Sequence, residues 1–301
     1  MNIHEWGIAL LCTVIPGDGL MPLTMAQLRT LSQRVSGLGA PEEPMGELAP
    51  AILEKLGYNS DQAQRICALM SRETQLERYL DRARNRGIFL LTRLSPDYPP
   101  RLHQLLRLYA PPVLFAAGDD RLLSRNGVGV VGSRALKPVG AQFARRVGQL
   151  AAIEGLSVIS GNALGADRTA QEACLRFGGS VVSFIADELT HHLPGKGESV
   201  LMLSEGGYDL PFSNPRALHR NHLIHALGEK TFVAQCDLET GGTWAGTMEN
   251  LRHSWSEVYV CDDGTEAMAE LVHRGATAVN LKELYSLEMV TPDQRSFFDK
   301  K

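Results

Sequence analysis

The chain has 301 residues, 44% of them hydrophobic and 21% charged, with a formal net charge of −4 at pH 7. This composition excludes a chain that is disordered or fibrous throughout, and the length fits two domains. The longest apolar runs, such as Ile8–Ile15, fall far short of the roughly 20 residues that span a bilayer. Met1–Gly7 lacks the basic start of a secretory signal, so we expect a cytoplasmic protein with no membrane partner.

The five cysteines are widely spaced and include no CxxC pair, so the sequence predicts neither a disulfide framework nor a structural metal site. Charge is uneven along the chain: residues 121–230 carry 12 Lys and Arg against 9 Asp and Glu, whereas residues 231–301 carry 6 against 12. Most of the basic residues are Arg, whose planar guanidinium suits phosphate oxygens. The small basic surplus in the middle of the chain predicts a local anion site.

Residues 1–87 have the pattern of a small helical domain. The expected helices are Leu23–Val35, Glu47–Leu56 and a long one that Asn59 or Ser60 caps and that runs to about Arg86. Gly37–Pro44 is expected to be a loop. Residues 88–120 are predicted to form a connector, because two Pro-Pro pairs interrupt regular helix there, and Val113–Ala117 is a candidate edge strand.

From Val128 onward, short β-branched runs alternate with amphipathic helical stretches. The expected strands are Val128–Val131, Ser157–Ser160, Val181–Ile185, Val200–Ser204, Thr231–Gln235, Glu257–Cys261 and Thr277–Leu281. The expected helices are Pro138–Glu154, Ala166–Phe177, Pro215–Leu227, Thr243–Ser254 and Thr265–His273. Alternation of this kind predicts an α/β, Rossmann-like, mostly parallel sheet with helices on both faces over residues 121–285, followed by a tail at 286–301. Ala186–Ser199 is too short for a helical crossover, so a loop is expected there.

In such a sheet, ligands bind beyond the carboxyl ends of the strands. The first predicted strand is followed by Gly132, Ser133 and Arg134, with Lys137 close behind. A sharp turn, a hydroxyl and two cations at this place are typical of a phosphate cradle. The run Gly127–Gly132 puts its glycines mostly within the strand, so it does not predict a dinucleotide site.

The second strand leads into Gly161, Asn162, Gly165, Asp167 and Arg168, where two glycines flank a short loop that enters a helix. Asp167 is a candidate cap for that helix. Because Arg168 in a first helical turn opposes the helix dipole, it requires an anion nearby, either Asp167 or a ligand. This stretch is therefore interpreted as a second half of the same anion pocket.

Two further stretches extend the pattern. Arg220 and Asn221 lie in the first turns of a predicted helix, and a third loop carries Gly241, Gly242 and Thr243, with Thr243 as a candidate helix cap. Trp244 next to it fits either base stacking or the core. Histidines recur near Arg220, but a zinc site lacks a well-placed third ligand. Gly-rich loops at several strand ends together predict one concave anion site.

These residues resemble the DNA-processing protein A (DprA/Smf) family. The matching stretches are VVGSR (Val130–Arg134), the SG…G.D element Ser160–Asp167, LSEGG (Leu203–Gly207), the RN…I element at Arg220, Asn221 and Ile224, TGGTWAG (Thr240–Gly246) and the lead-in Ser95–Gly118. The helical N-terminus resembles the family's small SAM-like domain. The chain departs from the family pattern at Leu164, where Arg is usual, and at His222, where a second Arg is usual.

The resemblance implies a homodimeric, Rossmann-like protein that binds single-stranded DNA and passes it to a RecA-type recombinase, in natural transformation and recombination. It implies a binding and loading role with no cofactor and no catalysis. The DNA contacts that it implies fall on Gly132, Ser133, Arg134 and Lys137, with further contacts from Arg220 and Asn221. Gly161, Gly165 and Asp167 are implied to line the pocket. From position alone, we add Asn162, Arg168, Gly241, Gly242 and Thr243 to the candidate nucleic-acid site.

Two alternatives stay open. The Gly241–Glu249 stretch resembles the loop of nucleoside-monophosphate phosphoribohydrolases of the wider superfamily, with one extra residue and no proline, so a nucleotide sensor or hydrolase is a second hypothesis. The extra residue turns Glu249 by about 100° around a helix relative to the glycines. The third hypothesis is an interaction module that self-associates through the basic middle and the acidic C-terminal third.

Overall fold

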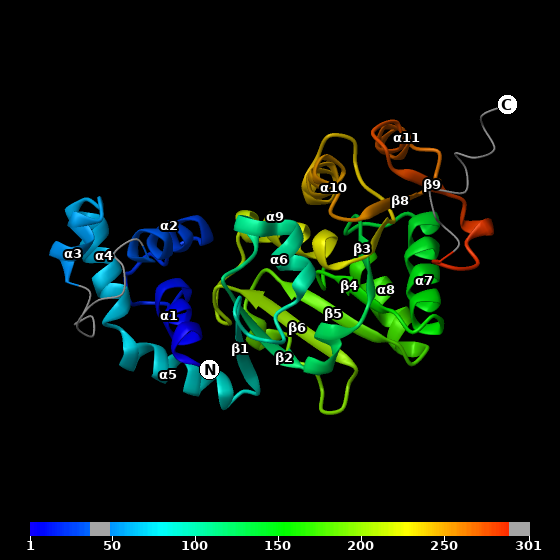
Figure 1. Cartoon of the computed structure of the whole chain (residues 1–301). Helices are drawn as coiled ribbons and strands as arrows, with labels where there is room; N and C mark the ends of the chain where they lie inside the picture. The colour runs from blue at the N-terminus through cyan, green and yellow to red at the C-terminus, as the bar shows by residue number, and fades with distance from the viewer. Residues whose placement is uncertain (37–48, 289–301) are drawn as a thin grey trace.

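A nine-stranded sheet is the central element of the part of the chain that the computed structural model describes, residues 1–36 and 49–288 (Figure 1). The sheet order is β1-β2-β6-β5-β4-β3-β7-β8-β9. In this order, each of the seven strands from β6 to β9 pairs in parallel with its neighbours among them. Strand β2 pairs antiparallel with both β1 and β6. The strands are β1 (Ile88–Thr92), β2 (Val113–Gly118), β3 (Gly127–Val131), β4 (Ser157–Ser160), β5 (Ser180–Ile185), β6 (Val200–Glu205), β7 (Lys230–Val233), β8 (Glu257–Cys261) and β9 (Thr277–Val279).

Helices cover both faces of this sheet, because its parallel strands are apolar on both sides. One face packs against α7 (Pro138–Ile153) and α8 (Ala166–Arg176), around Phe143 and Phe232. The other face packs against α6 (Pro100–Leu106), α9 (Asn214–Leu227), α10 (Gly241–His253) and α11 (Glu266–His273). The predicted Rossmann-like α/β fold is confirmed, and each of the seven predicted strands is present.

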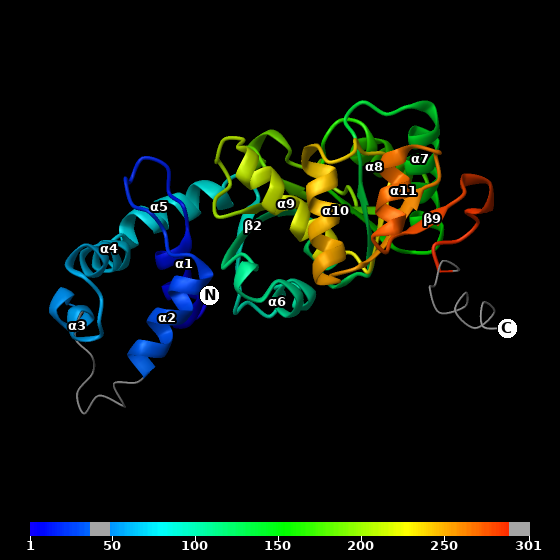
Figure 2. The same ribbon diagram turned by 90° about the horizontal axis from the view of Figure 1, so that it is seen from above.

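Five helices precede the sheet: α1 (Ile3–Cys12), α2 (Met25–Ser36), α3 (Pro50–Lys55), α4 (Ser60–Met70) and α5 (Glu73–Arg84). In both views they lie at the end of the molecule where β1 and β2 are, away from α11 and β9 (Figures 1 and 2). Tyr79 of α5 packs against Phe115 of β2 and stacks on Tyr208, with ring centroids 4.5 Å apart. The helical part therefore shares a core with the edge of the sheet.

Two predictions for the N-terminal part need correction, and a third falls on residues that the structure does not describe. The long helix expected up to Arg86 is two helices, because Arg72 between them turns inward and donates hydrogen bonds to the carbonyls of Leu10 and Thr13 and pairs with Asp18 at 2.6 Å. Within the predicted connector 88–120, the candidate strand Val113–Ala117 is confirmed as β2, but it lies between β1 and β6 and not at the edge, and β1 was not predicted. The expected loop Gly37–Pro44 lies outside the described residues.

No helix within residues 1–36 and 49–288 is long and apolar enough to cross a membrane. The segment Ala186–Ser199 contains only the short 3-10 helix Leu189–His191, in agreement with the predicted loop.

Candidate nucleic-acid interface

The order of the strands reverses at β3, whose neighbours are β4 on one side and β7 on the other. The helix after β3 covers one face of the sheet and the helix before β7 covers the other, so the chain leaves a crevice at the carboxyl ends of these strands. A cavity of about 600 Å³ lies there. Its lining combines the loops after β3, β4 and β7 with the first turns of α9, which share no continuous stretch of sequence.

The loop after β3 is fixed by Gln235 at the end of β7. The Ser133 amide donates to the Gln235 carbonyl over 2.8 Å, and the Lys137 amide donates to the Gln235 side-chain oxygen over 2.7 Å. The Gln235 amide group in turn donates to the Ala135 carbonyl. Arg134 lies between these anchored positions, is exposed and lines the cavity, and no Asp or Glu within the described ranges forms an ion pair with it. Its guanidinium is therefore available to an anion.

The loop after β4 folds around a buried carboxylate. Asp167 accepts hydrogen bonds from the amides of Gly161, over 2.9 Å, and Ala163, over 3.3 Å. The prediction that Asp167 caps the helix is wrong, because α8 begins at Ala166 after Gly165 and the carboxylate binds the loop instead. Gly165 has φ +84°, and a Cβ there would meet the carbonyl of Ser133, so only glycine fits where the two loops touch.

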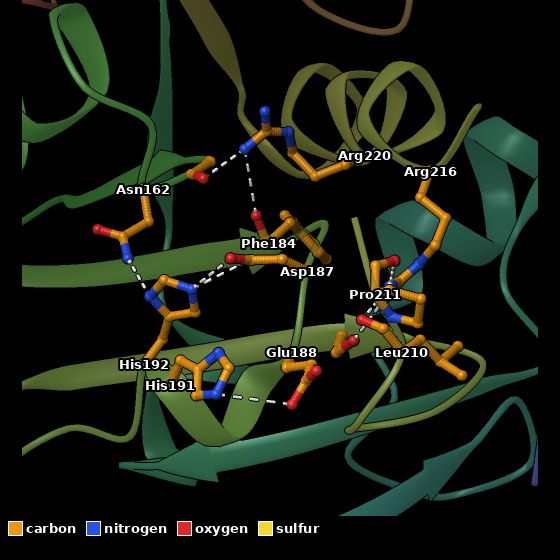
Figure 3. A network of polar contacts seen from close by, with 12 residues as sticks. Asn162, Phe184, Asp187, Glu188, His191, His192, Leu210, Pro211, Arg216 and Arg220 are labelled. Carbon is orange, nitrogen blue, oxygen red and sulfur yellow. Dashed lines mark hydrogen bonds and ion pairs between the residues drawn. The ribbon is translucent and has the colours of Figure 1, made fainter. Parts of the chain in front are cut away.

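Arg220 of α9 connects α9 to the same loop (Figure 3). Its guanidinium donates to the carbonyls of Gly161 and Phe184 and lies 4.0 Å from Asp167. Only 11% of its side chain is exposed, and burial lowers its pKa. Burial also raises the pKa of Asp167, an effect that the positive charge of Arg220 opposes. Arg220 lines the cavity, and its Nη1 holds the loop after β4 at Gly161 and β5 at Phe184, while its buried Nε has no hydrogen-bond partner among the described residues.

The loop after β7 presents the beginning of a helix to the cavity. Helix α10 starts at Gly241, so Thr243 lies inside the first turn, and the predicted capping role of Thr243 is wrong. Gly241, Gly242 and Thr243 all line the cavity. The first amides of a helix have no partner within the helix and attract anions. The Asn221 side chain donates to the Gly242 carbonyl over 2.9 Å and so joins α9 to this loop. Trp244 is buried in the core beneath it.

Nine of the fourteen candidate residues therefore line one cavity: Gly132, Ser133, Arg134, Asp167, Arg220, Asn221, Gly241, Gly242 and Thr243. Five do not line it: Lys137, Gly161, Asn162, Gly165 and Arg168. Of these, Lys137 and Arg168 are exposed beside it. Asn162 turns toward His192, whose other ring nitrogen lies 2.9 Å from Asp187 (Figure 3).

Sequence reasoning missed an apolar side of the cavity. Phe212, Ala217, Leu218, Cys236 and Ala245 line it, together with the polar Asn214, Asp237 and Thr240. Phe212 and Leu218 are 50% and 40% exposed. The only sequence signal was their position after the fourth predicted strand, in a stretch without a recognisable motif.

The hydrolase hypothesis and the zinc site considered from the sequence can be compared with this geometry. Glu249, the acid that the hydrolase hypothesis needs, does not line the cavity and pairs with Arg252 at 3.0 Å and His253 at 3.4 Å. Among residues 1–36 and 49–288, no group of three His, Cys, Asp or Glu side chains has the geometry to hold a metal ion.

Comparisons with known proteins agree with this architecture. The chain is similar to the DNA processing protein DprA of Streptococcus pneumoniae, with 31% identity over 206 residues, which cover 62% of this chain and 69% of that protein. It is 27% identical over 175 residues to protein Smf of a Synechocystis strain. That match covers 54% of this chain and only 44% of the Synechocystis protein, so the chain spans less than half of that relative.

Two solved structures share the fold. The structure of DNA processing protein A from Streptococcus pneumoniae matches with a TM-score of 0.66 at 23% identity, covering 88% of this chain and 98% of that one. DNA processing protein A from Helicobacter pylori, a structure described for its single-stranded DNA binding mode, matches with a TM-score of 0.54 at 22% identity, covering 65% of this chain and 92% of that one. The family model for DNA recombination-mediator protein A matches residues 89–287, from β1 through the last described strand. The chain therefore belongs to the DNA recombination-mediator protein A family.

Proposed function

We propose that this protein binds single-stranded DNA in the cavity at the carboxyl ends of β3, β4 and β7 and delivers it to a RecA-type recombinase. The role is binding and loading in the cytoplasm, without a cofactor and without catalysis. Relatives named as DNA-processing proteins and a related structure described for its single-stranded DNA binding mode support the proposal.

One observation carries it: an exposed cation that forms no ion pair with the described acids and the amide end of a helix face the same cavity as an apolar wall. Arg134 and the first turn of α10 supply the anion-binding side, and Phe212 and Leu218 supply the apolar side. Single-stranded DNA offers a phosphate and an unpaired base within one nucleotide, whereas duplex DNA keeps its bases stacked inside. A site with both surfaces favours the single strand.

The direct test is a fluorescence anisotropy titration with a labelled thymidine oligonucleotide, a duplex of the same length and mononucleotides, each at two salt concentrations. The proposal expects the single strand to bind most tightly and its affinity to fall as salt rises, because phosphate contacts release counterions. Equal affinity for the duplex, or tight binding of a mononucleotide that oligonucleotides do not displace, would contradict it. The second outcome would favour the nucleotide-sensor hypothesis.

Delivery to a recombinase is a separate step with its own measurement. The protein is expected to shorten the lag of RecA-type filament growth on single-stranded DNA that is covered by a single-strand-binding protein. An unchanged lag, with DNA binding intact, would restrict the function to DNA binding. Homodimer formation is tested by gel filtration coupled to light scattering, where a mass near 33 kDa would contradict it and twice that mass would support it.

A further inference from the structure

Phe212 is a large apolar side chain at the mouth of the cavity, in the loop between β6 and α9. Half of its surface is exposed although it lines the cavity. A ring left half in water loses the stabilisation that burial would give it, about 1 kcal/mol or more. Single exposed apolar residues are common on protein surfaces, so the exposure of Phe212 alone indicates nothing. What distinguishes Phe212 is how its loop is held.

The backbone immediately before Phe212 is anchored by the Arg216 side chain of α9 (Figure 3). Arg216 donates to the carbonyls of Leu210, over 2.8 Å, and Pro211, over 3.0 Å. It also donates to the hydroxyl of Ser204 over 3.0 Å, and that hydroxyl donates to the Gly207 carbonyl.

On the other side of Phe212, the Ser213 hydroxyl accepts a hydrogen bond from the Arg216 amide and caps α9. The loop is therefore fixed immediately before and after a ring that is not itself buried. A binding group that is ordered before its ligand arrives loses less entropy on binding, and this arrangement provides that order.

The surroundings of the ring indicate which part of a ligand it meets. Ala217 and Leu218, in the first turns of α9, continue the apolar wall from Phe212. Arg134 and the amides at Gly241 and Gly242 belong to the polar loops of the same cavity. A nucleotide whose phosphate lies at the polar loops would place its flat, uncharged base against the apolar wall, where a ring of any base type can stack.

We propose that Phe212 stacks on a base of the bound single strand and that Arg216 is a positioning residue that holds Phe212 at the cavity mouth. This inference rests on the proposed function and names one contact within it. It makes the site tolerant of sequence, because stacking reads the face of a base and not its edge.

The experiment compares a thymidine oligonucleotide with an abasic oligonucleotide of the same length, which has the phosphates but no bases. Phe212→Leu is expected to weaken binding of the thymidine strand about tenfold, within the range that loss of one base–aromatic stack produces, and to leave binding of the abasic strand unchanged. Phe212→Trp is expected to bind both strands as the wild-type protein does.

Three outcomes would overturn the stacking role: equal weakening of both strands by Phe212→Leu, no change for either strand, or a loss with Phe212→Trp as large as with Phe212→Leu. Failure of the wild-type protein to bind either strand would instead overturn the proposed function, and the stacking role with it. The two failures are therefore distinguishable.

The positioning role of Arg216 is tested by combining substitutions. Arg216→Gln is expected to weaken binding of the thymidine strand in the wild-type background and to have little effect in the Phe212→Leu background, because the ring that it positions is then absent. A purely structural role would lower affinity by the same factor in both backgrounds and for both strands, and that result would overturn this part of the inference. Unfolding midpoints of each variant identify any that fail to fold.

Discussion

The two rims of the sheet each carry a cavity of about 600 Å³, yet they differ in what their arginines do. At the carboxyl ends of the strands, Arg134 is exposed and free of ion pairs with the described acids. At the amino ends, Arg101 donates to the carbonyls of Ala226, Gly228 and Trp255. Arg101 at the amino rim is therefore occupied by the protein's own carbonyls.

The charged side chains around the two cavities also differ. The amino-rim cavity is also lined by the acids Asp97, Asp120 and Glu229, and its exposed Arg121 pairs with Asp119 at 2.7 Å. Helices that cover parallel strands end at the amino rim, where their last carbonyls attract cations, and begin at the carboxyl rim, where their amides attract anions. The two cavities are therefore not distinguished by volume. They differ in the helix ends that face them, which present amides at the carboxyl rim and carbonyls at the amino rim.

The largest expected difference between the two rims is in how much the loss of one arginine lowers the free energy of unfolding. Arg220→Ala leaves Asp167 buried without its cation and is expected to lower the free energy of unfolding by about 3–5 kcal/mol. Urea denaturation measures it. Arg125→Ala at the amino rim, where an exposed guanidinium donates to the Ser180 hydroxyl over 3.3 Å, is the control and should cost far less. Equal costs would show that Arg220 does not hold the loop.

The second prediction compares the stability cost of replacing two glycines at opposite ends of α8. Gly165 at the carboxyl rim and Gly178 at the amino rim both have positive φ, +84° and +75°, but only at Gly165 would a Cβ meet another loop. Gly165→Ala is expected to cost about 3 kcal/mol, since strain and overpacking add, and Gly178→Ala about 1 kcal/mol. Thermal unfolding of the pair is the measurement. If both variants lose the same stability, the loops after β3 and β4 are not in contact as described.

Helix α9 joins the rims, and buried His225 near its end makes it sensitive to pH. Burial lowers the pKa of His225 to about 3, against an ordinary value of 6.5. Between these values the unfolded chain binds a proton that the folded chain does not, so stability falls as pH falls. Relative to His225→Leu, the wild-type free energy of unfolding should drop by about 2 kcal/mol between pH 7 and pH 5. Parallel pH profiles of the two proteins would contradict this.

The smallest effect concerns binding. Arg134→Ala is expected to weaken binding of single-stranded DNA by about 1 kcal/mol, or about fivefold, and to reduce the slope of log affinity against log salt by about 0.7. Arg125→Ala, which removes an exposed arginine at the amino rim, should change neither quantity. If Arg125→Ala weakened DNA binding more than Arg134→Ala did, the DNA would bind at the amino rim, which would contradict the proposed site.

The sequence predicted the strand–helix alternation and the glycine loops because both depend on local patterns. It missed the break between α4 and α5, because the inward turn of Arg72 depends on the carbonyls at the end of α1, about 60 residues earlier. It also missed β1, which has a single short apolar run and pairs only with β2 within the described residues.

For the site, position after a strand was enough to bring nine candidates to one cavity. It was not enough to tell a cation that meets the ligand from one that holds a loop. Arg134 and Arg220 look alike in sequence, and their roles are separated by burial and by the carbonyls of Gly161 and Phe184 near Arg220. The apolar wall at Phe212 carries no motif and was not predicted.

The central claim is that single-stranded DNA binds at the carboxyl rim. Hydrogen–deuterium exchange of the full chain, with and without a saturating thymidine oligonucleotide, tests it most directly. Bound DNA at this rim should slow exchange in residues 132–137, 161–168 and 240–246 and leave exchange in 96–101 and 120–127 unchanged. Slowing confined to the second set, or to regions away from both cavities, would contradict it.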